Sequence, residues 1–422
     1  MNQQTNQSEP LRVLESQGLA SVTLTAHWSD EQASHEERLH VEKFSIWREA
    51  DMLPSAIGRN LAGLQQGDRL EAPIQPGDYT ENWHSTRQIV TKPASFDRHH
   101  RPGLVVTPRL GRFYPQGFFK GVAGLYREAV EPARIIELNA DRMKLDLNHP
   151  LARTRVKLQL GIDRVLPGRD RRTGRCDNPL DELLKFPGLA TPLQSGEDID
   201  FGDDAKGMTR MDDRADQVFY TTPRLIQHLD SMARRQLNTL YRRLIPPQAE
   251  ALDLMASFDS HLEGADLGKL HLLGMNQQEL SKNRLAESRI TQDLNRNPNL
   301  PFDSDSLDAI LCTAAIEYLT KPAEVLAETL RVLRPGGILV VSFSNRWFPT
   351  KAIGIWSELH EVERLGMVTQ WLRQSGYTNL NTFSARGWPR PADDIYAGQT
   401  PHSDPVYAAW GYKEDQSASL YP

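Results

Sequence analysis

The fold of the C-terminal half is decided by residues 307–343, which read LDAILCTAAIEYLTKPAEVLAETLRVLRPGGILVVSF. Two short apolar runs, 307–312 and 338–343, flank a segment of helical period that begins at Pro322 and ends near residue 333. Strand-length apolar runs on either side of an amphipathic helix are typical of two parallel strands joined by a crossover helix. This stretch therefore predicts a βαβ unit.

The same alternation continues upstream of this unit. Short runs at 251–254, 270–273 and 289–293 predict three further strands, and 277–283 predicts a short helix. A longer amphipathic pattern precedes them. Thr222 is its candidate N-cap, Pro223 fits the first helical turn, and Pro246 ends it. The C-terminal half is therefore predicted to be a doubly wound parallel α/β sheet with an amphipathic cover helix.

Ligands of open parallel sheets bind in the crevice at the carboxyl ends of the strands. The residues that follow each predicted strand are therefore candidates for the wall of a binding site. These wall candidates lie in 253–262, 274–276, 292–295 and 312–318.

Residues 217–413 resemble the class I S-adenosylmethionine-dependent methyltransferases. The resemblance is carried by LPFDSDSLDAI at 300–310, by EYL at 317–319 and by RPGGIL at 334–339. The stretch DPVYAAWGY at 404–412 is similar to the last, antiparallel strand of that fold. The loop DLMASFDSHL at 253–262 resembles a branch of the family that has a similar Asp-Leu-Met-x-Ser sequence.

The resemblance implies that S-adenosyl-L-methionine is the cofactor. The family's first loop is usually glycine-rich, whereas residues 255–258 contain no glycine for an unusual dihedral angle. Asn276 stands where the family usually has an acidic residue that bonds the ribose hydroxyls, and Asp293 with Leu294 matches the position that contacts the adenine. The implied cofactor-binding residues are Asp253, Met255, Ala256, Ser257, Gly274, Met275, Asn276, Gln292, Asp293, Leu294 and Cys312.

Three titratable side chains are candidates for a catalytic base. His261 closes the first loop, Glu317 follows the fourth strand, and His228 lies on the predicted cover helix. Each has a structural alternative, because His261 can hydrogen-bond the loop backbone, Glu317 can cap the next helix and the cover helix can serve packing alone. In similar enzymes the segment before the sheet folds over the cofactor. The candidate residues of the acceptor pocket are Tyr220, Arg224 and Tyr318.

Methyl transfer needs a nucleophile placed in line with the methyl group. The sequence lacks the Asn-Pro-Pro-aromatic motif that such enzymes use for amide and base nitrogens, which disfavours nucleic-acid bases and glutamine side chains as acceptors. A small thiol needs the least activation, because roughly a few per cent of it is thiolate at neutral pH. We therefore prefer S-methylation of a small thiol, with proteins and lipophilic hydroxyl compounds left open.

Residues 20–162 read as short β-type runs and resemble the FKBP-type prolyl isomerases, in particular their SlyD-like branch. The resemblance is carried by LPSAIGRNLAGLQQGD at 53–68, PGDY at 76–79 and DLNHPLA at 146–152. His27 replaces a tyrosine of the family and Arg153 replaces a glycine, which argues against isomerase turnover. The stretch 84–119 falls where that branch inserts its client-binding flap, and its aromatic residues are either a peptide surface or local core.

Composition excludes several classes of partner. Forty-nine Lys and Arg against 55 Asp and Glu give a net charge of −6, so no nucleic-acid or membrane partner is expected. The two cysteines, Cys176 and Cys312, support neither a disulfide framework nor a zinc site, and no metal is expected. The polar N-terminus and the lack of a run of about 18 apolar residues predict a cytoplasmic protein without a membrane span.

We therefore predict a multidomain protein with a β-rich, FKBP-like α+β domain followed by a doubly wound, Rossmann-like α/β methyltransferase domain. The predicted segments are a tail at 1–15, the first domain at 16–162, a charged linker at 163–216, the second domain at 217–413 and a tail at 414–422.

Three functions fit this organisation. The first is an active methyltransferase with an accessory FKBP-like domain, acting on a small-molecule nucleophile or on a protein client. The second is a non-catalytic methyltransferase-like scaffold with a peptide-binding or chaperone module. The third is an active peptidyl-prolyl isomerase with an appended nucleotide sensor.

Overall fold

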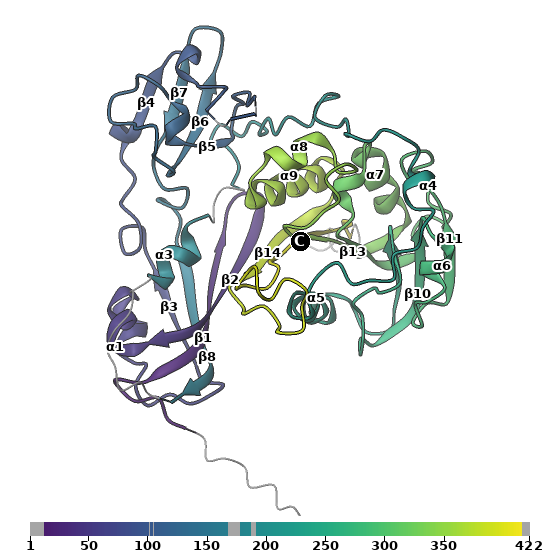
Figure 1. The fold of residues 1–422 in the computed structure, drawn as a ribbon, viewed down its shortest axis with the longest axis horizontal. Coiled ribbons are helices and arrows are strands. Elements are labelled where there is room, and N and C mark those ends of the chain that lie inside the picture. The colour runs from purple at the N-terminus through teal and green to yellow at the C-terminus, as the bar shows by residue number, and fades with distance from the viewer. Residues whose placement is uncertain (1–11, 101, 104, 168–177, 187–190, 416–422) are drawn as a thin grey trace, which may run out of the picture.

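The computed structural model describes residues 12–100, 102–103, 105–167, 178–186 and 191–415. Among these residues the main feature is one sheet of eleven strands, in the order β11-β10-β9-β12-β13-β15-β14-β2-β1-β8-β3. The sheet runs through both halves of the chain (Figure 1). Cys176 and the greater part of both predicted tails lie outside the described residues.

The C-terminal part of the sheet, as described, contains seven strands. They are β9 (Ala249–Leu254), β10 (Leu267–Gly274), β11 (Ser288–Thr291), β12 (Leu307–Thr313), β13 (Leu333–Phe343), β14 (Thr378–Arg386) and β15 (Val406–Tyr412). Strands β9 to β13 pair in parallel, and β15 runs antiparallel to both β13 and β14. The predicted Rossmann-like sheet and its antiparallel last strand are confirmed.

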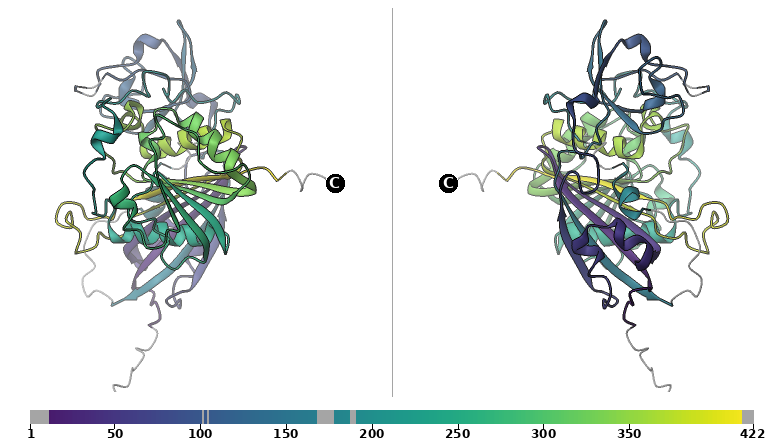
Figure 2. Two further views of the ribbon diagram at one scale, coloured as in Figure 1. Left: turned by 90° about the vertical axis from the view of Figure 1, so that its right-hand side faces the viewer. Right: turned by 90° about the vertical axis from the view of Figure 1, so that its left-hand side faces the viewer.

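Helices cover both faces of this part of the sheet, whose twisted strands fan out in Figure 2. On β13, Ile338 and Val340 pack into the core under α5, whereas Leu339 and Val341 pack into the opposite core under α7 to α9. Both faces of the strand are therefore buried, as is usual for parallel sheets. The helices are α5 (Ser231–Leu244), α6 (Gln277–Leu280), α7 (Pro322–Val332), α8 (Gly354–Glu358) and α9 (Glu361–Gln374), with the 3-10 turn η5 (Ile316–Tyr318) after β12.

The cover helix begins later than the sequence indicated. The prediction placed its N-cap at Thr222, but α5 starts at Ser231 and its cap is Asp230, whose side chain accepts hydrogen bonds from the backbone N–H groups of Met232 and Ala233. Ile226, which lies between the predicted and the observed start of the helix, is 64% exposed. A carboxylate N-cap accepts hydrogen bonds from two free N–H groups at once. It therefore fixes the first residue of the helix, which the pattern of helix propensity does not show.

The N-terminal part continues the same sheet with four strands and its own core. The strands β1 (Leu19–Ser29), β2 (Ala33–Ser45), β3 (Arg69–Ile74) and β8 (Val156–Leu166) pair antiparallel in the order β2-β1-β8-β3. Short helices cover this part of the sheet. They are α1 (Ile46–Glu49), η1 (Ala50–Met52), α2 (Ser55–Gly58) and α3 (Pro179–Leu184).

A separate four-stranded sheet is inserted between β3 and β8. Its strands β4 (Gln88–Thr91), β5 (Phe113–Pro115), β6 (Pro132–Leu138) and β7 (Met143–Asp146) take the order β4-β7-β6-β5, with the turns η2 (Ser85–Arg87), η3 (Pro93–Ser95) and η4 (Gln116–Phe118). Tyr114, Phe118 and Phe119 are at most 3% exposed and form its core with Phe96. Of the two interpretations of these aromatic residues, local core is the one that the structure supports.

The two parts of the large sheet are joined by β2 and β14, which pair in parallel from Ala33 opposite Leu380 to Leu39 opposite Arg386. At this junction the Glu37 carboxylate is buried and accepts a hydrogen bond from the Ser384 hydroxyl. Burial raises the pKa of Glu37 to about 7. The junction is therefore a continuous hydrogen-bonded sheet.

Within the predicted linker, the residues around Ile199 pack against the C-terminal helix α9. Ile199 and Gln370 of α9 exchange two hydrogen bonds of 3.0 Å between the Ile199 backbone and the Gln370 amide. The inserted sheet also contacts α9, because Arg112 and Glu363 form an ion pair at 3.4 Å with both side chains 3% exposed. Around Ile199 the predicted linker therefore contacts the second domain, whereas Leu180, Leu183 and Leu184 of α3 pack into the core of the first. The limits of the linker stay a prediction.

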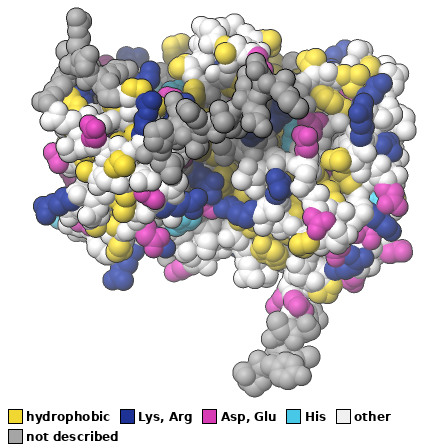
Figure 3. Space-filling model, turned by 90° about the horizontal axis from the view of Figure 1, so that it is seen from below, with side chains coloured by type: hydrophobic (Ala, Val, Ile, Leu, Met, Phe, Trp, Pro, Cys, Tyr) yellow, Lys and Arg dark blue, Asp and Glu magenta, His cyan; other side chains and the backbone are white. Residues whose placement is uncertain are grey.

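The surface seen from below carries interspersed acidic and basic side chains (Figure 3). A groove between the two parts has the same mixed character, with Arg386 and Arg390 facing it as well as Glu42 and Glu182. None of the helices within the described ranges is both long and apolar enough to cross a membrane.

Candidate functional site

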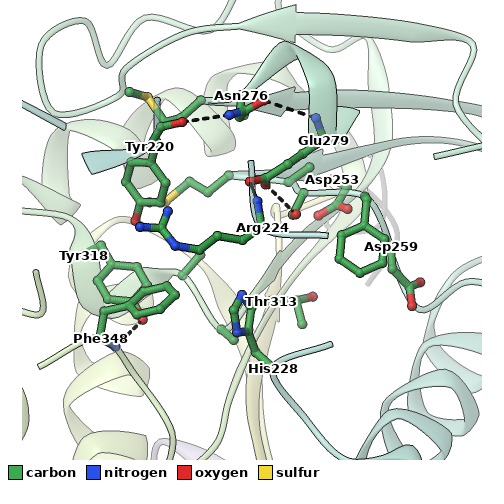
Figure 4. A pocket seen from close by; sticks show the side chains of 18 of the residues that line it. Tyr220, Arg224, His228, Asp253, Asp259, Asn276, Glu279, Thr313, Tyr318 and Phe348 are labelled. Atoms are coloured by element: carbon green, nitrogen blue, oxygen red, sulfur yellow. Dashed lines mark hydrogen bonds between the residues drawn. The ribbon is translucent and has the colours of Figure 1, made fainter. Parts of the chain in front are cut away.

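A cavity of about 160 Å³ opens at the carboxyl ends of β9, β10, β11 and β12. Figure 4 shows the side chains that surround it. One wall is formed by the loops after these strands, and the other is formed by residues 210–229, which we call the strap. The strap contains α4 (Asp216–Phe219) and crosses the strand ends before α5 begins.

Most of the site residues expected from the sequence line this cavity together. The structure places there Tyr220, Arg224, His228, Asp253, Met255, Ala256, Ser257, His261, Gly274, Met275, Asn276, Gln292, Asp293, Leu294 and Tyr318. Two expected residues, Cys312 and Glu317, do not line it.

Cys312 and Glu317 lie in the core behind the cavity. Cys312 packs with Leu339 and Val341, because side chains alternate along β12 and Thr313 is the one that faces the cavity. Glu317 lies on η5, is 1% exposed and has a carboxylate oxygen, Oε2, without a hydrogen-bond partner in the described part of the chain. Burial raises the pKa of Glu317 to about 8. We therefore withdraw the expected cofactor contact of Cys312 and the expected catalytic role of Glu317.

Replacing Glu317 by glutamine is expected to stabilise the protein increasingly as the pH rises. The folded pKa of about 8 exceeds the usual value of 4.5, so the contribution of Glu317 to stability is greatest below pH 4.5 and is lost as the pH rises to 8. Glu317→Gln removes this loss, on the order of 1 kcal/mol per pH unit over that range. Urea unfolding at pH 5, 6.5 and 8 measures it, with the exposed Glu324→Gln as control. A pH-independent difference would contradict this placement of Glu317.

The first loop makes its unusual turn without glycine. Met255 has a φ of 58°, so a residue with a side chain takes the left-handed conformation that glycine adopts most easily. The turn brings Ala256 against the next strand, where its backbone N–H donates to the Leu273 carbonyl at 2.8 Å. A side chain at Gly274 would lie 2.2 Å from the Ala256 carbonyl oxygen. The absence of a side chain at Gly274 therefore lets the backbones of the first and second loops approach closely.

Asp253 lies beneath this loop at the end of β9. It is 3% exposed, and its carboxylate accepts a hydrogen bond of 2.5 Å from the Ser260 hydroxyl, which in turn accepts one from the Asn283 amide. Burial raises the pKa of Asp253 to about 7. These bonds fix the return of the loop from Met255 to Ser260, so Asp253 shapes the cavity wall.

Asn276 holds the strap, which differs from the ribose contact that its position implied. Its amide N–H₂ donates to the carbonyls of Tyr220 at 2.8 Å and Thr221 at 3.3 Å, and its oxygen accepts from the N–H groups of Gln278 and Glu279. Four hydrogen bonds use both donors and both lone pairs of the amide. Asn276 is therefore a cap and a strap anchor.

Glu279 is an acidic side chain of the cavity wall that was not among the residues expected from the sequence. One of its oxygens accepts the Arg224 backbone N–H at 2.7 Å and the other accepts the Ser257 hydroxyl at 2.6 Å. Each carboxylate oxygen can accept a second hydrogen bond. An acid five residues after the end of β10, in the first turn of a short helix, was the available signal.

A buried charge cluster anchors the strap. The Asp216 carboxylate contacts Arg210 at 2.9 Å, Lys351 at 3.1 Å and the Asn295 amide at 2.9 Å. The Lys351 side chain is 0% exposed and also donates to the Arg214 and Asp212 carbonyls. The strap is therefore tied to the loop after β13 by a buried ion pair and to the loop after β11 by a hydrogen bond.

Two histidines lie at the edge of the cavity. His228 packs edge to face against Phe348, with ring centroids 5.2 Å apart. Partial burial of the ring and the nearby Arg224 guanidinium lower the pKa of His228 below its usual value of 6.5. With a pKa below 6.5, His228 is mostly neutral at pH 7 and can accept a proton.

His261 has a φ of 56°, and its Nδ1 lies 3.3 Å from the Asp259 carboxylate.

Comparison with known proteins agrees with this fold. A family model described as a methyltransferase domain matches residues 256–341. The demethylmenaquinone methyltransferase of Clavibacter sepedonicus is 29% identical over 137 residues, which are 32% of this chain and 53% of that protein. The ubiquinone/menaquinone biosynthesis C-methyltransferase UbiE of Bartonella tribocorum is 34% identical over 98 residues, which are 22% of this chain and 37% of that protein.

A solved structure of an S-adenosylmethionine-dependent methyltransferase from Thermotoga maritima is 15% identical, with a TM-score of 0.32, over 43% of this chain and 92% of its own. The chain spans about half the length of the first curated relatives that it matches. Residues 256–341 are therefore similar to a methyltransferase domain.

Proposed function

We propose that the C-terminal domain transfers a methyl group from S-adenosyl-L-methionine to a small nucleophile bound in the cavity. The observation that carries this proposal is the position of the cavity. It lies at the carboxyl ends of the parallel strands, and the part of its wall between Ala256 and Leu319 falls within the residues that match a methyltransferase domain.

The residues of the cavity fit the cofactor. Asp293 and Leu294 follow β11, and they supply a carboxylate for the adenine amino group and an apolar contact for its ring. Glu279 has acceptor capacity for the ribose hydroxyls, in place of Asn276. Ala256 and Gly274 provide a narrow backbone wall, which suits the methionine part.

The bound cofactor supplies an electrophilic methyl group on a sulfonium. The chain's own residues place the acceptor and keep water out. Thr313, Tyr318 and Phe348 form the wall after β12 and β13, and the strap closes the site above them. His228 is placed to take a proton from an acceptor that needs deprotonation.

The acceptor is a small molecule. A thiol remains our preferred nucleophile, because it is partly ionised at neutral pH and needs the least help from a base. Two matched relatives are named for demethylmenaquinone and for ubiquinone/menaquinone biosynthesis, so an aromatic acceptor is the second candidate. The aromatic rings of Tyr220, Tyr318 and Phe348 favour an acceptor with a flat apolar part.

We further propose that residues 16–162 are an FKBP-like accessory domain with the inserted sheet β4 to β7 as its flap. Tyr79 supports this, because its hydroxyl contacts the carbonyls of Leu151 and Thr154 and so joins two of the stretches that carry the resemblance. Glu36, across from His27 on β1 and β2, forms an ion pair with Arg243 of α5. This face of the accessory domain is therefore in contact with the methyltransferase domain.

S-adenosylhomocysteine is expected to stabilise the protein against thermal unfolding. At 100 times its Kd the ligand adds about 2.7 kcal/mol to the free energy of unfolding. Asp293→Ala should reduce the shift strongly, whereas Asp303→Ala, an exposed change outside the cavity, should leave it intact. No shift for the wild type would reject the methyltransferase proposal and favour a non-catalytic scaffold with a peptide-binding module.

A further inference from the structure

Arg224 reaches across the cavity with part of its guanidinium unused. Its backbone N–H donates to Glu279, and its side chain extends toward Tyr220 and Tyr318 (Figure 4). Nη2 donates to the Phe219 carbonyl at 3.1 Å. Nη1 is buried and finds no hydrogen-bond partner within the described ranges. A buried donor without a partner is costly, so it is usually matched by a group that the structure does not contain.

The acidic groups of the cavity do not neutralise this charge. Glu279 accepts from the Arg224 backbone and from Ser257, and Asp216 is held by Arg210, Lys351 and Asn295. Asp259 is engaged by His261 and the Gln227 amide. Within the described part of the chain, no carboxylate forms an ion pair with the Arg224 guanidinium. A ligand with an anionic oxygen would supply the missing partner.

Aromatic rings surround the guanidinium on its other sides. Its central carbon lies 4.3 Å from the ring centroid of Phe219, 5.3 Å from that of Phe348 and 5.8 Å from that of Tyr220. Such rings hold the guanidinium plane in place and leave its N–H edge as the polar part of the wall. A ligand at this end of the cavity therefore meets a flat apolar surface and one fixed cationic edge.

We propose that Arg224 binds a carboxylate on the methyl acceptor, and that the acceptor is a small aromatic or apolar acid. This inference rests on the proposed methyltransferase function. Phe348 follows β13, whereas the residues assigned to adenine follow β11, four positions away in the strand order. The guanidinium thus lies at the acceptor end of the cavity. The carboxylate of the cofactor's methionine part has the same chemistry, and the experiment separates the two sources.

The first arm measures direct binding of benzoate and its neutral analogue benzamide by calorimetry, with S-adenosylhomocysteine present and absent. We expect the wild type to bind benzoate at least about tenfold more tightly than benzamide, as a charge-assisted bond implies. Arg224→Gln should remove this difference and Arg224→Lys should keep part of it. Arg235→Gln on α5, outside the cavity, should leave it unchanged.

The second arm identifies the source of the carboxylate. Arg224→Gln should leave the Kd of S-adenosylhomocysteine within about twofold of the wild type, because the proposal assigns the guanidinium to the acceptor and not to the cofactor. Loss of S-adenosylhomocysteine affinity, with unchanged affinity for methylthioadenosine, would assign Arg224 to the cofactor and overturn the proposal. Equal binding of benzoate and benzamide to the wild type would overturn it as well.

The two proposals fail in different ways. If the wild type does not bind S-adenosylhomocysteine, the methyltransferase proposal fails, and benzoate binding without it still decides whether Arg224 forms an anion site. If S-adenosylhomocysteine binds and benzoate does not, only the assignment of Arg224 is wrong. Thermal unfolding of Arg224→Gln and Arg224→Lys checks that both variants are folded.

Discussion

Gly274→Ala is expected to lower both the stability of the protein and its affinity for S-adenosylhomocysteine. The new Cβ would lie 2.2 Å from the Ala256 carbonyl oxygen and 3.0 Å from Leu280 Cδ2, so the first loop has to move. Overpacking of this kind costs about 1–3 kcal/mol. The displaced loop forms a wall of the cavity, so we expect the Kd to rise by about tenfold or more, which corresponds to 1.4 kcal/mol.

Urea unfolding and ligand titration measure the two effects of Gly274→Ala. Gly398→Ala is the matched control, because no atom lies within 4 Å of a Cβ at that position and its φ is not positive. Unchanged stability and affinity in Gly274→Ala would contradict the close approach of the two loops.

Lys351→Met is expected to be the most destabilising single change in the strap anchor. It removes the 3.1 Å contact with Asp216 and the hydrogen bonds to the Arg214 and Asp212 carbonyls, all in a position with 0% exposure. Removing one partner of a buried ion pair costs about 3–5 kcal/mol when the remaining charge stays unpaired. Asp216 keeps Arg210 and Asn295, so we expect a loss near the lower end of that range. We also expect the strap to open more often, because its anchoring cluster is weakened.

Limited proteolysis of Lys351→Met should cut within residues 210–229 faster than in the wild type, and urea unfolding gives the loss of stability. Lys206→Met, an exposed change just before the strap, should alter neither the cleavage rate nor the stability. Equal cleavage rates in the wild type and Lys351→Met would mean that the Asp216 cluster does not hold the strap.

The sequence predicted the central strands and helices well because their signals are local. Apart from Ser342, the runs 307–312 and 338–343 are apolar on every residue that the sheet buries, and α7 begins at Pro322 as expected. The helix α9 was left unassigned, although His360 and Glu363 form a capping box and a helical pattern follows them. The start of α5 was misplaced because Thr222 and Asp230 are both acceptable caps, and only packing distinguishes them.

The candidate site was predicted as a set of strand ends, and its chemistry was predicted less well. The rule that ligands bind at the carboxyl ends of parallel strands found most of the lining residues. It did not show that Cys312 and Glu317 lie in the core. It also did not show that the Asn276 amide donates its hydrogen bonds to the strap. Applied after β13, the same rule would have found Phe348.

The amino-acid sequence by itself determined the strand and helix periods, the parallel sheet and the edge at which the site forms, because these depend on residues close together in the chain. Only the tertiary structure decided which carboxylates of the described residues have hydrogen-bond or ion-pair partners, and that Nη1 of Arg224 has none among these residues. Asp216 meets Lys351 across 135 residues and Glu37 meets Ser384 across 347, and β14 joins the two parts into one sheet. Burial and hydrogen-bond partners set these charges, and both arise from segments that meet only after the chain has folded.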